Sequence, residues 1–204
     1  MKYVKILGLL AVAAAALMAF AGSASAATLT SPENVTYTGE IHATSEGHAK
    51  LENPVAKIEC HSTVKGTVEK HGTGVTVGGA ISELLWGTEG SLNGKCTNSW
   101  HVTTVTAGSL EVHYKAPGEG TLTSTGATVD TTRLGVTCTY RTNETHIGTL
   151  TDSSKTVPAG GTATLHVSAS IPLHSESSGL CGSGNAKWEG SYSVLTPMSL
   201  WIDQ

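Results

Sequence analysis

The segment Ala163-Thr164-Leu165-His166-Val167-Ser168-Ala169-Ser170-Ile171 alternates apolar and polar residues without interruption. Successive side chains of a β-strand point to opposite faces, so the apolar residues of this segment share one face and the polar residues share the other. A helix would instead place its apolar residues three and four positions apart. The segment therefore predicts a β-strand with one buried face and one exposed face.

The same alternation recurs in short segments along the rest of the chain. Turn sequences such as Pro117-Gly118 and Ala159-Gly160-Gly161 separate these segments. Only residues 81–85 have a pattern that a helical turn would also fit. Many short antiparallel strands with one buried face predict an all-β fold, either an antiparallel β-sandwich or an open barrel. The other alternating segments are 35–43, 56–60, 64–68, 75–81, 110–114, 134–140 and 188–194.

The first residues have the three parts of an export signal. Lys2 and Lys5 give a positive start, residues 6–20 are apolar, and Ala24-Ser25-Ala26 offers the small residues that signal peptidase requires. The apolar run is shorter than the ~20 residues of a membrane-spanning helix, and no basic stop-transfer cluster follows it. We therefore predict a signal peptide over residues 1–26, cleavage after Ala26, and a secreted mature chain without a membrane span.

Removal of the signal makes the chain more acidic. It leaves 178 of the 204 residues, and 10 of the 12 basic residues against all 16 acidic ones, for a net charge of about −6. Nucleic acids and anionic membrane surfaces require clustered lysine and arginine, so neither is predicted as a partner.

The four cysteines lie in two stretches that share one order of features. Thr28-Leu29-Thr30-Ser31 reappears as Thr121-Leu122-Thr123-Ser124, and an apolar strand with a cysteine follows each copy. A repeated order of this kind indicates one structural unit used twice. It predicts a first β repeat over residues 27–116 and a second over residues 117–204. The other matched segments are 58–60 with 136–138, 66–68 with 148–150, 75–81 with 163–171, and 109–112 with 199–202.

The duplication selects one of the three ways to pair four cysteines. Export favours oxidation, and the repeats predict the disulfides Cys60–Cys96 and Cys138–Cys181. Cys60 and Cys138 alternate in phase with apolar neighbours, so both sulfurs are expected to point inward. Each bridge is expected to stabilise the fold by roughly 4 kcal/mol. No cysteine pair has the C-x-x-C spacing of a metal site, so no metal is predicted there.

The tryptophans have different predicted roles. Trp100 and Trp188 each follow the second cysteine of a repeat, and each is expected to pack against its own disulfide. Trp86 has no counterpart and lies in a glycine-rich stretch, which makes it a candidate contact residue for a ligand or partner. The alternative is that Trp86 is a core residue beside Leu84 and Leu85.

The segments Tyr37-Thr38-Gly39-Glu40-Ile41, Ser45-Glu46-Gly47-His48, Ile58-Glu59-Cys60 and 134–140 together resemble a family of uncharacterised secreted actinobacterial β-rich proteins. That resemblance spans nearly the whole mature chain and defines no functional residues. A weaker likeness is to exported "protein activator of alkane oxidation" proteins, in which a strand, a cysteine, a glycine-spaced hairpin, a second cysteine and a tryptophan follow the signal. Those proteins have a single unit, whereas this chain has two.

Catalytic and metal motifs do not stand out. The nine histidines occur singly, without an H-E-x-x-H or H-x-H pattern, and no serine lies in a G-x-S-x-G frame. Glu83 and Glu89 flank Trp86 and come nearest to the paired carboxylates of a glycosidase, but an ordinary loop explains them. The aspartates are too isolated for a calcium loop. No enzyme activity, cofactor or metal is predicted.

The sequence thus favours a non-enzymatic secreted or cell-surface β-protein that acts in adhesion, matrix assembly or ligand binding. One alternative is a small extracellular hydrolase whose site forms only in the fold. Another is a fibre subunit that shares strands between copies, because sheet edges can accept a partner strand.

Overall fold

The structure is a computed structural model, and it describes residues 27–31, 35–53, 55–69, 76–152, 162–197 and 199–203. The predicted signal peptide lies outside these residues. The described residues are mostly strands, with two short 3-10 turns and no α-helix, so the all-β prediction is confirmed. No helix among them is long and apolar enough to cross a membrane.

The strands are β1 (Thr28–Ser31), β2 (Val35–Thr36), β3 (Glu40–Ser45), β4 (Ala49–Asn53), β5 (Ala56–Thr67), β6 (Thr76–Gly87), β7 (His101–Thr106), β8 (Ser109–Ala116), β9 (Glu119–Thr125), β10 (Thr128–Arg133), β11 (Val136–Arg141), β12 (Thr145–Thr151), β13 (Thr164–Ile171), β14 (Ala186–Thr196) and β15 (Trp201–Asp203). The 3-10 turns are η2 (Thr97–Ser99) and η3 (Gly179–Cys181). Residues 81–85 belong to β6 and form no helical turn.

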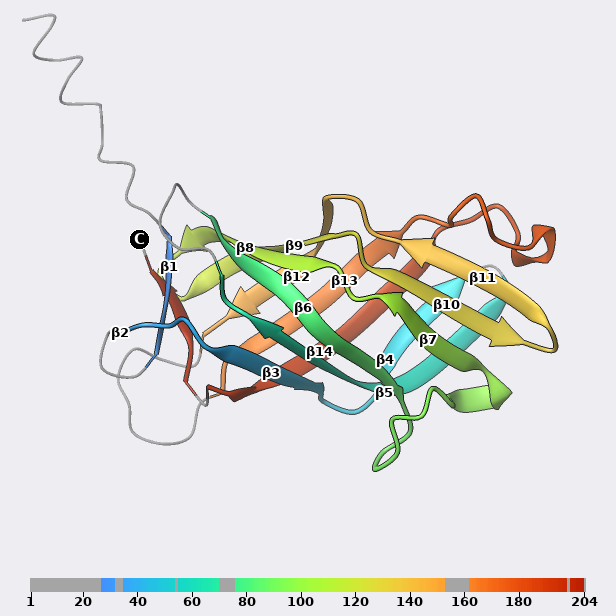
Figure 1. The fold of residues 1–204 in the computed structure, drawn as a ribbon, viewed down its shortest axis with the longest axis horizontal. Coiled ribbons are helices and arrows are strands. Elements are labelled where there is room, and N and C mark those ends of the chain that lie inside the picture. The colour runs from blue at the N-terminus through green and yellow to red at the C-terminus, as the bar shows by residue number, and fades with distance from the viewer. Residues whose placement is uncertain are drawn as a thin grey trace, which may run out of the picture.

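Eight strands form a closed antiparallel barrel (Figure 1). Their order is β13, β12, β9, β8, β6, β5, β3 and β14, and a long ladder between β13 and β14 closes the ring. β4 continues β3 in the same place, since both strands pair with β5 on one side and with β14 on the other. Of the predicted architectures, the barrel is correct, and it is closed rather than open.

Three barrel strands bend and continue toward one end. β7 leads into β8, β9 leads into β10, and β11 leads into β12, so the small sheet β11-β10-β7 lengthens the barrel on one side. Gly108 and Gly126 lie at two of these bends with φ of 73° and 74°, a backbone region that favours glycine. We count β7 with β8, β9 with β10, and β11 with β12 as one bent strand each. The strands then follow one another around the barrel in the order in which they occur along the chain. The topology is therefore an up-and-down meander.

The opposite end is covered by the sheet β15-β1-β2, beside which the chain ends (Figure 1). Leu29 of β1 and Ile202 of β15 are buried. Leu29 lines the same interior space as Val77 and Val112 of the barrel wall. The terminal strands therefore plug this end of the barrel.

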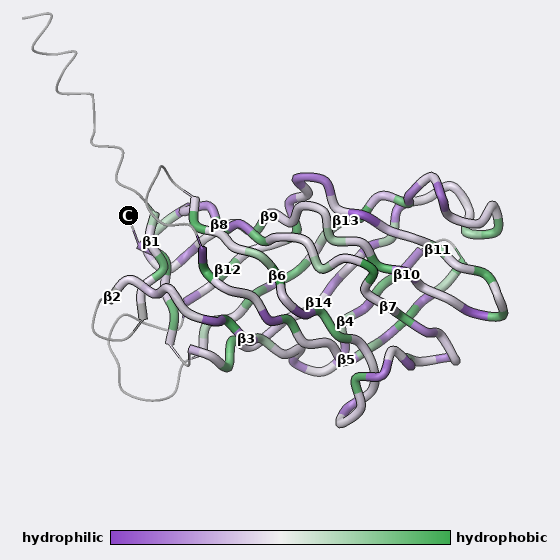
Figure 2. Tube along the Cα trace, viewed as in Figure 1, coloured by the Kyte–Doolittle hydropathy of each residue, from purple (hydrophilic) through white to green (hydrophobic). Residues whose placement is uncertain are grey.

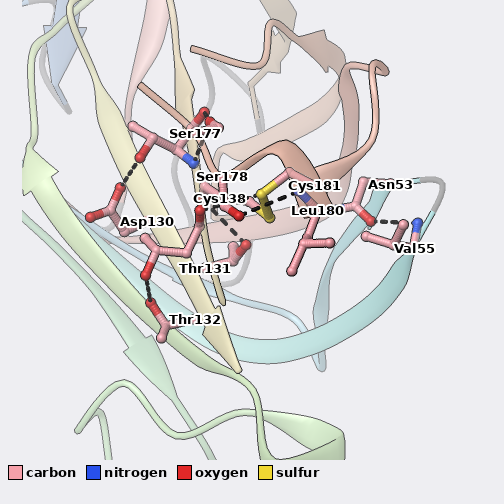
Figure 3. Close-up of a disulfide and its surroundings, with 12 residues drawn as sticks. Asn53, Val55, Asp130, Thr131, Thr132, Cys138, Ser177, Ser178, Leu180 and Cys181 are labelled. Carbon is pink, nitrogen blue, oxygen red and sulfur yellow. Dashed lines mark hydrogen bonds between the residues drawn. A yellow bond between two sulfur atoms is a disulfide. The ribbon is translucent and has the colours of Figure 1, made fainter. Parts of the chain in front are cut away.

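Both predicted disulfides are present. Cys60 of β5 joins Cys96 in the β6–β7 connection, with Cα atoms 5.0 Å apart, and Cys138 of β11 joins Cys181 of η3, with Cα atoms 5.6 Å apart. Both Cys60 and Cys138 are buried, as their phase in the alternation predicts. Figure 3 shows the Cys138–Cys181 bridge with Ser178 and Leu180 beside it.

The two predicted repeats contribute to one barrel rather than to two separate sandwiches. The turn between β8 and β9, at residues 117–118, separates the four barrel positions of the first half from the four of the second. Val112 pairs with Leu122 between β8 and β9, and Ile202 pairs with Leu29 between β15 and β1. The comparison of the two halves matches Val112 with Ile202 and Leu122 with Leu29. The two junctions between the halves therefore pair equivalent residues.

Hydrophobic residues alternate with polar ones along the strands (Figure 2). β13 shows the alternation most simply, because every second residue from Leu165 to Ile171 is buried and those between are exposed or partly exposed. The buried faces meet inside the barrel and form its core.

Candidate functional site

The barrel interior holds an apolar cavity of about 60 Å³ near the end that β7, β10 and β11 extend. On the same measure one water molecule needs about 10–15 Å³, so the space is several water molecules large. Its wall is almost entirely hydrocarbon and aromatic, with Leu84, Leu122, Ile147, Val167 and Ile171 among the lining residues. A space of this composition is expected to stay dry or to bind an apolar molecule.

Aromatic rings form one side of this cavity. Trp86 of β6 and Trp188 of β14 have ring centroids 5.8 Å apart at a tilt of 58°. Trp188 also meets Tyr192, on the same strand, edge to face at 6.4 Å. Tilted and edge-to-face arrangements are favourable for aromatic pairs, and they present both faces and edges to a bound molecule.

The tyrosine hydroxyls of the wall are hydrogen-bonded to other strands. Tyr192 Oη lies 2.7 Å from Ser62 Oγ on β5, and Asn53 Nδ2 of β4 donates to Tyr140 Oη of β11. Burial raises the pKa of Tyr192 to about 12, and burial also raises the pKa of Tyr140. Both side chains are therefore neutral at physiological pH, and they fix the positions of their rings.

Trp188 has a buried indole nitrogen without a hydrogen bond. Its N–H lies near the Tyr192 hydroxyl, and this contact lowers the Tyr192 pKa against the larger effect of burial. The geometry does not make a hydrogen bond, so Trp188 Nε1 has no acceptor. An acceptor atom on a bound molecule could satisfy this donor.

A second apolar cavity, also of about 60 Å³, adjoins the first toward the end that β1 plugs. Val64, Ile81, Leu110 and Leu165 line both spaces. The interior is therefore a row of two small apolar chambers, of which the one with the tryptophans carries the aromatic wall.

Among the described residues that line the aromatic chamber there is no carboxylate, histidine, lysine or cysteine. General acid–base or nucleophilic catalysis needs such a group within reach of the bound molecule. The arrangement can hold and orient a neutral apolar molecule, and its residues offer no proton donor or acceptor other than hydroxyl and indole groups.

Trp86 lies in this wall, not in an exposed loop. Its ring is 5 % exposed, and Nε1 donates to Thr104 Oγ1 at 3.0 Å. This burial agrees with the alternative that Trp86 is a core residue, because the glycines around Trp86 belong to β6 and the strand carries the ring inward. The alternation of Leu84 and Trp86 was the signal for this, since both are buried and exposed Leu85 lies between them. A contact role for Trp86 stays a prediction, now for the barrel interior.

Trp100 and Trp188 do not occupy matching surroundings. Trp100 precedes β7, its carbonyl accepts a hydrogen bond from the N–H of Cys96 at 2.9 Å, and the Arg133 guanidinium lies 5.8 Å from its ring centroid. Trp188, expected beside the Cys138–Cys181 bridge, instead places its ring against Trp86 and Tyr192.

The carboxylates considered for a glycosidase do not reach the cavity. Glu83 forms an ion pair with Lys65, 2.9 Å apart, with both side chains partly exposed to solvent. Glu89 is exposed in the turn that follows β6. The rings of His48 and His61 lie 4.7 Å apart, yet no group of three metal-ligating side chains occurs within the described part of the chain. His71 lies outside it.

Asp130 and Asp152 both have structural contacts. Asp130 Oδ1 accepts a hydrogen bond from Thr139 Oγ1 at 2.6 Å across the β10–β11 ladder. Asp152 Oδ2 accepts from the N–H of Ile202 at 2.7 Å, which ties β15 to the end of β12. Burial raises the pKa of Asp152 to about 7, against the lowering effect of that hydrogen bond, and nearby Asp203 adds to the rise.

Comparisons with protein-family models, curated proteins and solved structures return no match for this chain. The resemblances inferred from the sequence therefore stay predictions.

Proposed function

We propose that this chain is a secreted, non-catalytic protein that binds one small, neutral, apolar molecule inside its barrel. The observation that carries the proposal is the apolar chamber of about 60 Å³ with its wall of Trp86, Trp188, Tyr140 and Tyr192. Barrels of eight strands are wide enough either to be filled by side chains or to hold one small ligand. Ligand sites are mostly apolar with a few placed polar groups, which is the composition of this wall.

Ligand binding is preferred over the other functions that the sequence left open. A hydrolase is disfavoured because no ionisable acid or base other than tyrosine lines the chamber. Strand sharing in a fibre requires a free sheet edge, whereas β13 and β14 pair with each other and close the ring. Both edges of the eight-stranded sheet are thus used within the molecule, and the edge strands that remain, β2, β7, β11 and β15, belong to the two three-stranded sheets.

Export is supported by the signal sequence together with the cysteines. All four cysteines form disulfides, and none is free. Such bridges persist in oxidising environments outside the cytosol.

The proposal is tested with fluorobenzene, a neutral aromatic probe, and ¹⁹F NMR. The wild-type mature protein should bind it saturably at one site. Ala127→Leu should abolish that binding, because Ala127 lines the chamber and the larger side chain would occupy it. The folded state of this variant should be as stable as the wild type or more stable, since the added methyl groups enter empty space.

Ala163→Leu is the matched control. Ala163 is fully buried but does not line the chamber. The same substitution there should overpack the core, cost about 1–3 kcal/mol of stability and leave fluorobenzene binding intact. Absence of saturable binding to the wild type, or binding that survives Ala127→Leu, would refute the proposal.

A further inference from the structure

We infer that molecules enter the aromatic chamber sideways, between β6 and β7, and that the Trp86 ring is the gate, held shut by its hydrogen bond to Thr104. The inference rests on the proposed function, because it describes access to the same chamber. Neither the Trp86 side chain nor the seam between β6 and β7 belongs to a catalytic or metal motif.

The seam between β6 and β7 is the first observation. β6 pairs with β5 along one edge, and residues 76–80 of β6 pair with β8 along the other edge. Beyond residue 80 that second edge faces β7, yet β6 and β7 share no ladder among the described residues. β7 pairs with β10, and His101 at its start forms a single bridge with Lys95. The barrel wall therefore lacks its backbone hydrogen bonds along this stretch.

The backbone contacts described across the seam lie at its two ends. At one end the N–H of Ile81 donates to the Gly108 carbonyl at 2.9 Å. At the other end Gly94 accepts from Val102 and donates to the Trp86 carbonyl, both at 2.8 Å. The stretch between these ends is bridged by side chains.

A groove on the outside of this seam is the second observation. It encloses about 220 Å³ and is lined by residues of β6, of β7 and of the connection between them. Leu84 and Trp86 line both this groove and the interior chamber. The Trp86 ring therefore separates the chamber from the outer groove.

A short chain of hydrogen bonds keeps the ring in place. Trp86 Nε1 donates to Thr104 Oγ1 at 3.0 Å, and Thr104 Oγ1 donates to the Leu84 carbonyl at 2.7 Å. The Trp188 ring, which also lines the chamber, packs against the Trp86 ring. Rotation of one side chain and loss of the Thr104 bridge would open the seam without breaking any strand ladder.

Three other routes into the chamber are more strongly closed. The terminal sheet β15-β1-β2 plugs one end of the barrel, and continuous ladders join β5 to β6 and β13 to β14. Opening any of these requires the loss of several backbone hydrogen bonds at once, whereas the β6–β7 gate requires the loss of one side-chain bridge.

The test uses Thr104→Val, which keeps the β-branched shape that suits a strand and removes the hydroxyl. Fluorobenzene exchange, followed by ¹⁹F exchange spectroscopy, should accelerate several-fold and up to about tenfold in both directions, the effect of losing one net hydrogen bond. The Kd should change much less than either rate, because a gate alters the barrier and not the bound state. Thr106→Val on the same strand, an exposed threonine, is the control and should exchange at the wild-type rate.

A second readout requires no ligand, so that failure of the gate and failure of the proposed function are distinguishable. The Trp86 indole N–H should exchange with deuterium faster than the core amides of β13, and Thr104→Val should accelerate its exchange further. Thr106→Val should not. If fluorobenzene does not bind but this pattern holds, the proposed function fails and the gate stands. If the Trp86 N–H exchanges only with global unfolding, or if Thr104→Val leaves ligand exchange unchanged, the gate is refuted.

Discussion

At the scale of single residues, the position of Trp86 depends on its strand more than on its sequence neighbours. Gly78, Gly79 and Gly87 suggest a loop when they are considered as a group, but all three lie within β6. Gly79 is required there by packing, since a Cβ atom on it would lie 1.7 Å from the Thr67 carbonyl oxygen. Glycine in a strand often marks such a close approach of two backbones. The period of two then determines that Trp86 points inward.

Substitutions at Trp86 should show this burial. Trp86→Ala should cost about 3–5 kcal/mol, because it removes a buried indole and leaves a cavity, and the total stability of a domain is only about 5–15 kcal/mol. Trp86→Phe should cost less, since it keeps an aromatic ring and loses the hydrogen bond to Thr104. Urea denaturation of the two variants measures the difference.

Leu85→Ala is the control for these substitutions. Leu85 is the adjacent residue on the outer face of β6 and is 37 % exposed. Leu85→Ala should reduce the free energy of unfolding much less than Trp86→Ala does. Equal, small losses at both positions would mean that the Trp86 ring lies at the surface.

At the scale of elements, alternation predicted most of the strands, and the cysteine order predicted both disulfides. The bends at Gly108 and Gly126 and the continuity of β3 with β4 were not predictable, because they depend on pairing between distant segments. The closure of β13 on β14 was not predictable for the same reason. The sequence alone also could not identify the residues of the chamber wall as one group. Leu51, Trp86, Tyr140 and Trp188 come together only when the barrel closes.

Asp152 links one element, β15, to the barrel, and this link should depend on pH. Its pKa of about 7 in the folded protein lies above the value of about 3.9 expected in the unfolded chain. Between these two values the folded state binds more protons than the unfolded state, so stability should fall as the pH rises from about 4 to 7. The loss should be at most a few kcal/mol, and screening by solvent reduces it because the carboxyl is only partly buried.

Asp152→Asn separates this effect from other titrations. The amide oxygen can still accept the hydrogen bond from the N–H of Ile202, but the side chain no longer titrates. Calorimetric melting curves at pH 4.5 and pH 8 should therefore differ less for the variant than for the wild type, and the variant should be the more stable protein at pH 8. An unchanged difference between the two pH values would show that Asp152 does not set it.

At the scale of the whole molecule, we expect the two halves of the sequence to depend on each other for folding. Each half supplies four consecutive positions of one barrel, and the pairs β8–β9 and β15–β1 join the halves at matched residues. An open sheet of four positions would expose its inner apolar face and two unpaired edges. A duplicated unit that closes with its copy would remove both liabilities, and the duplication itself stays a prediction from the sequence.

Separate expression of the halves tests this dependence. Residues 27–116 alone should not form a cooperatively folded monomer, and a mixture with residues 117–204 should recover the near-ultraviolet circular dichroism of the intact protein. Sedimentation and thermal melts of each fragment provide the check. A fragment that melts cooperatively as a monomer would show that its half is an independent domain.

The most direct measurement is a crystal structure of residues 27–204 soaked with fluorobenzene. The account predicts density for one ring inside the closed barrel, in contact with Trp86 and Trp188, with the strand pairing unchanged. An interior filled by side chains, or fluorobenzene bound only on the outer surface, would contradict it.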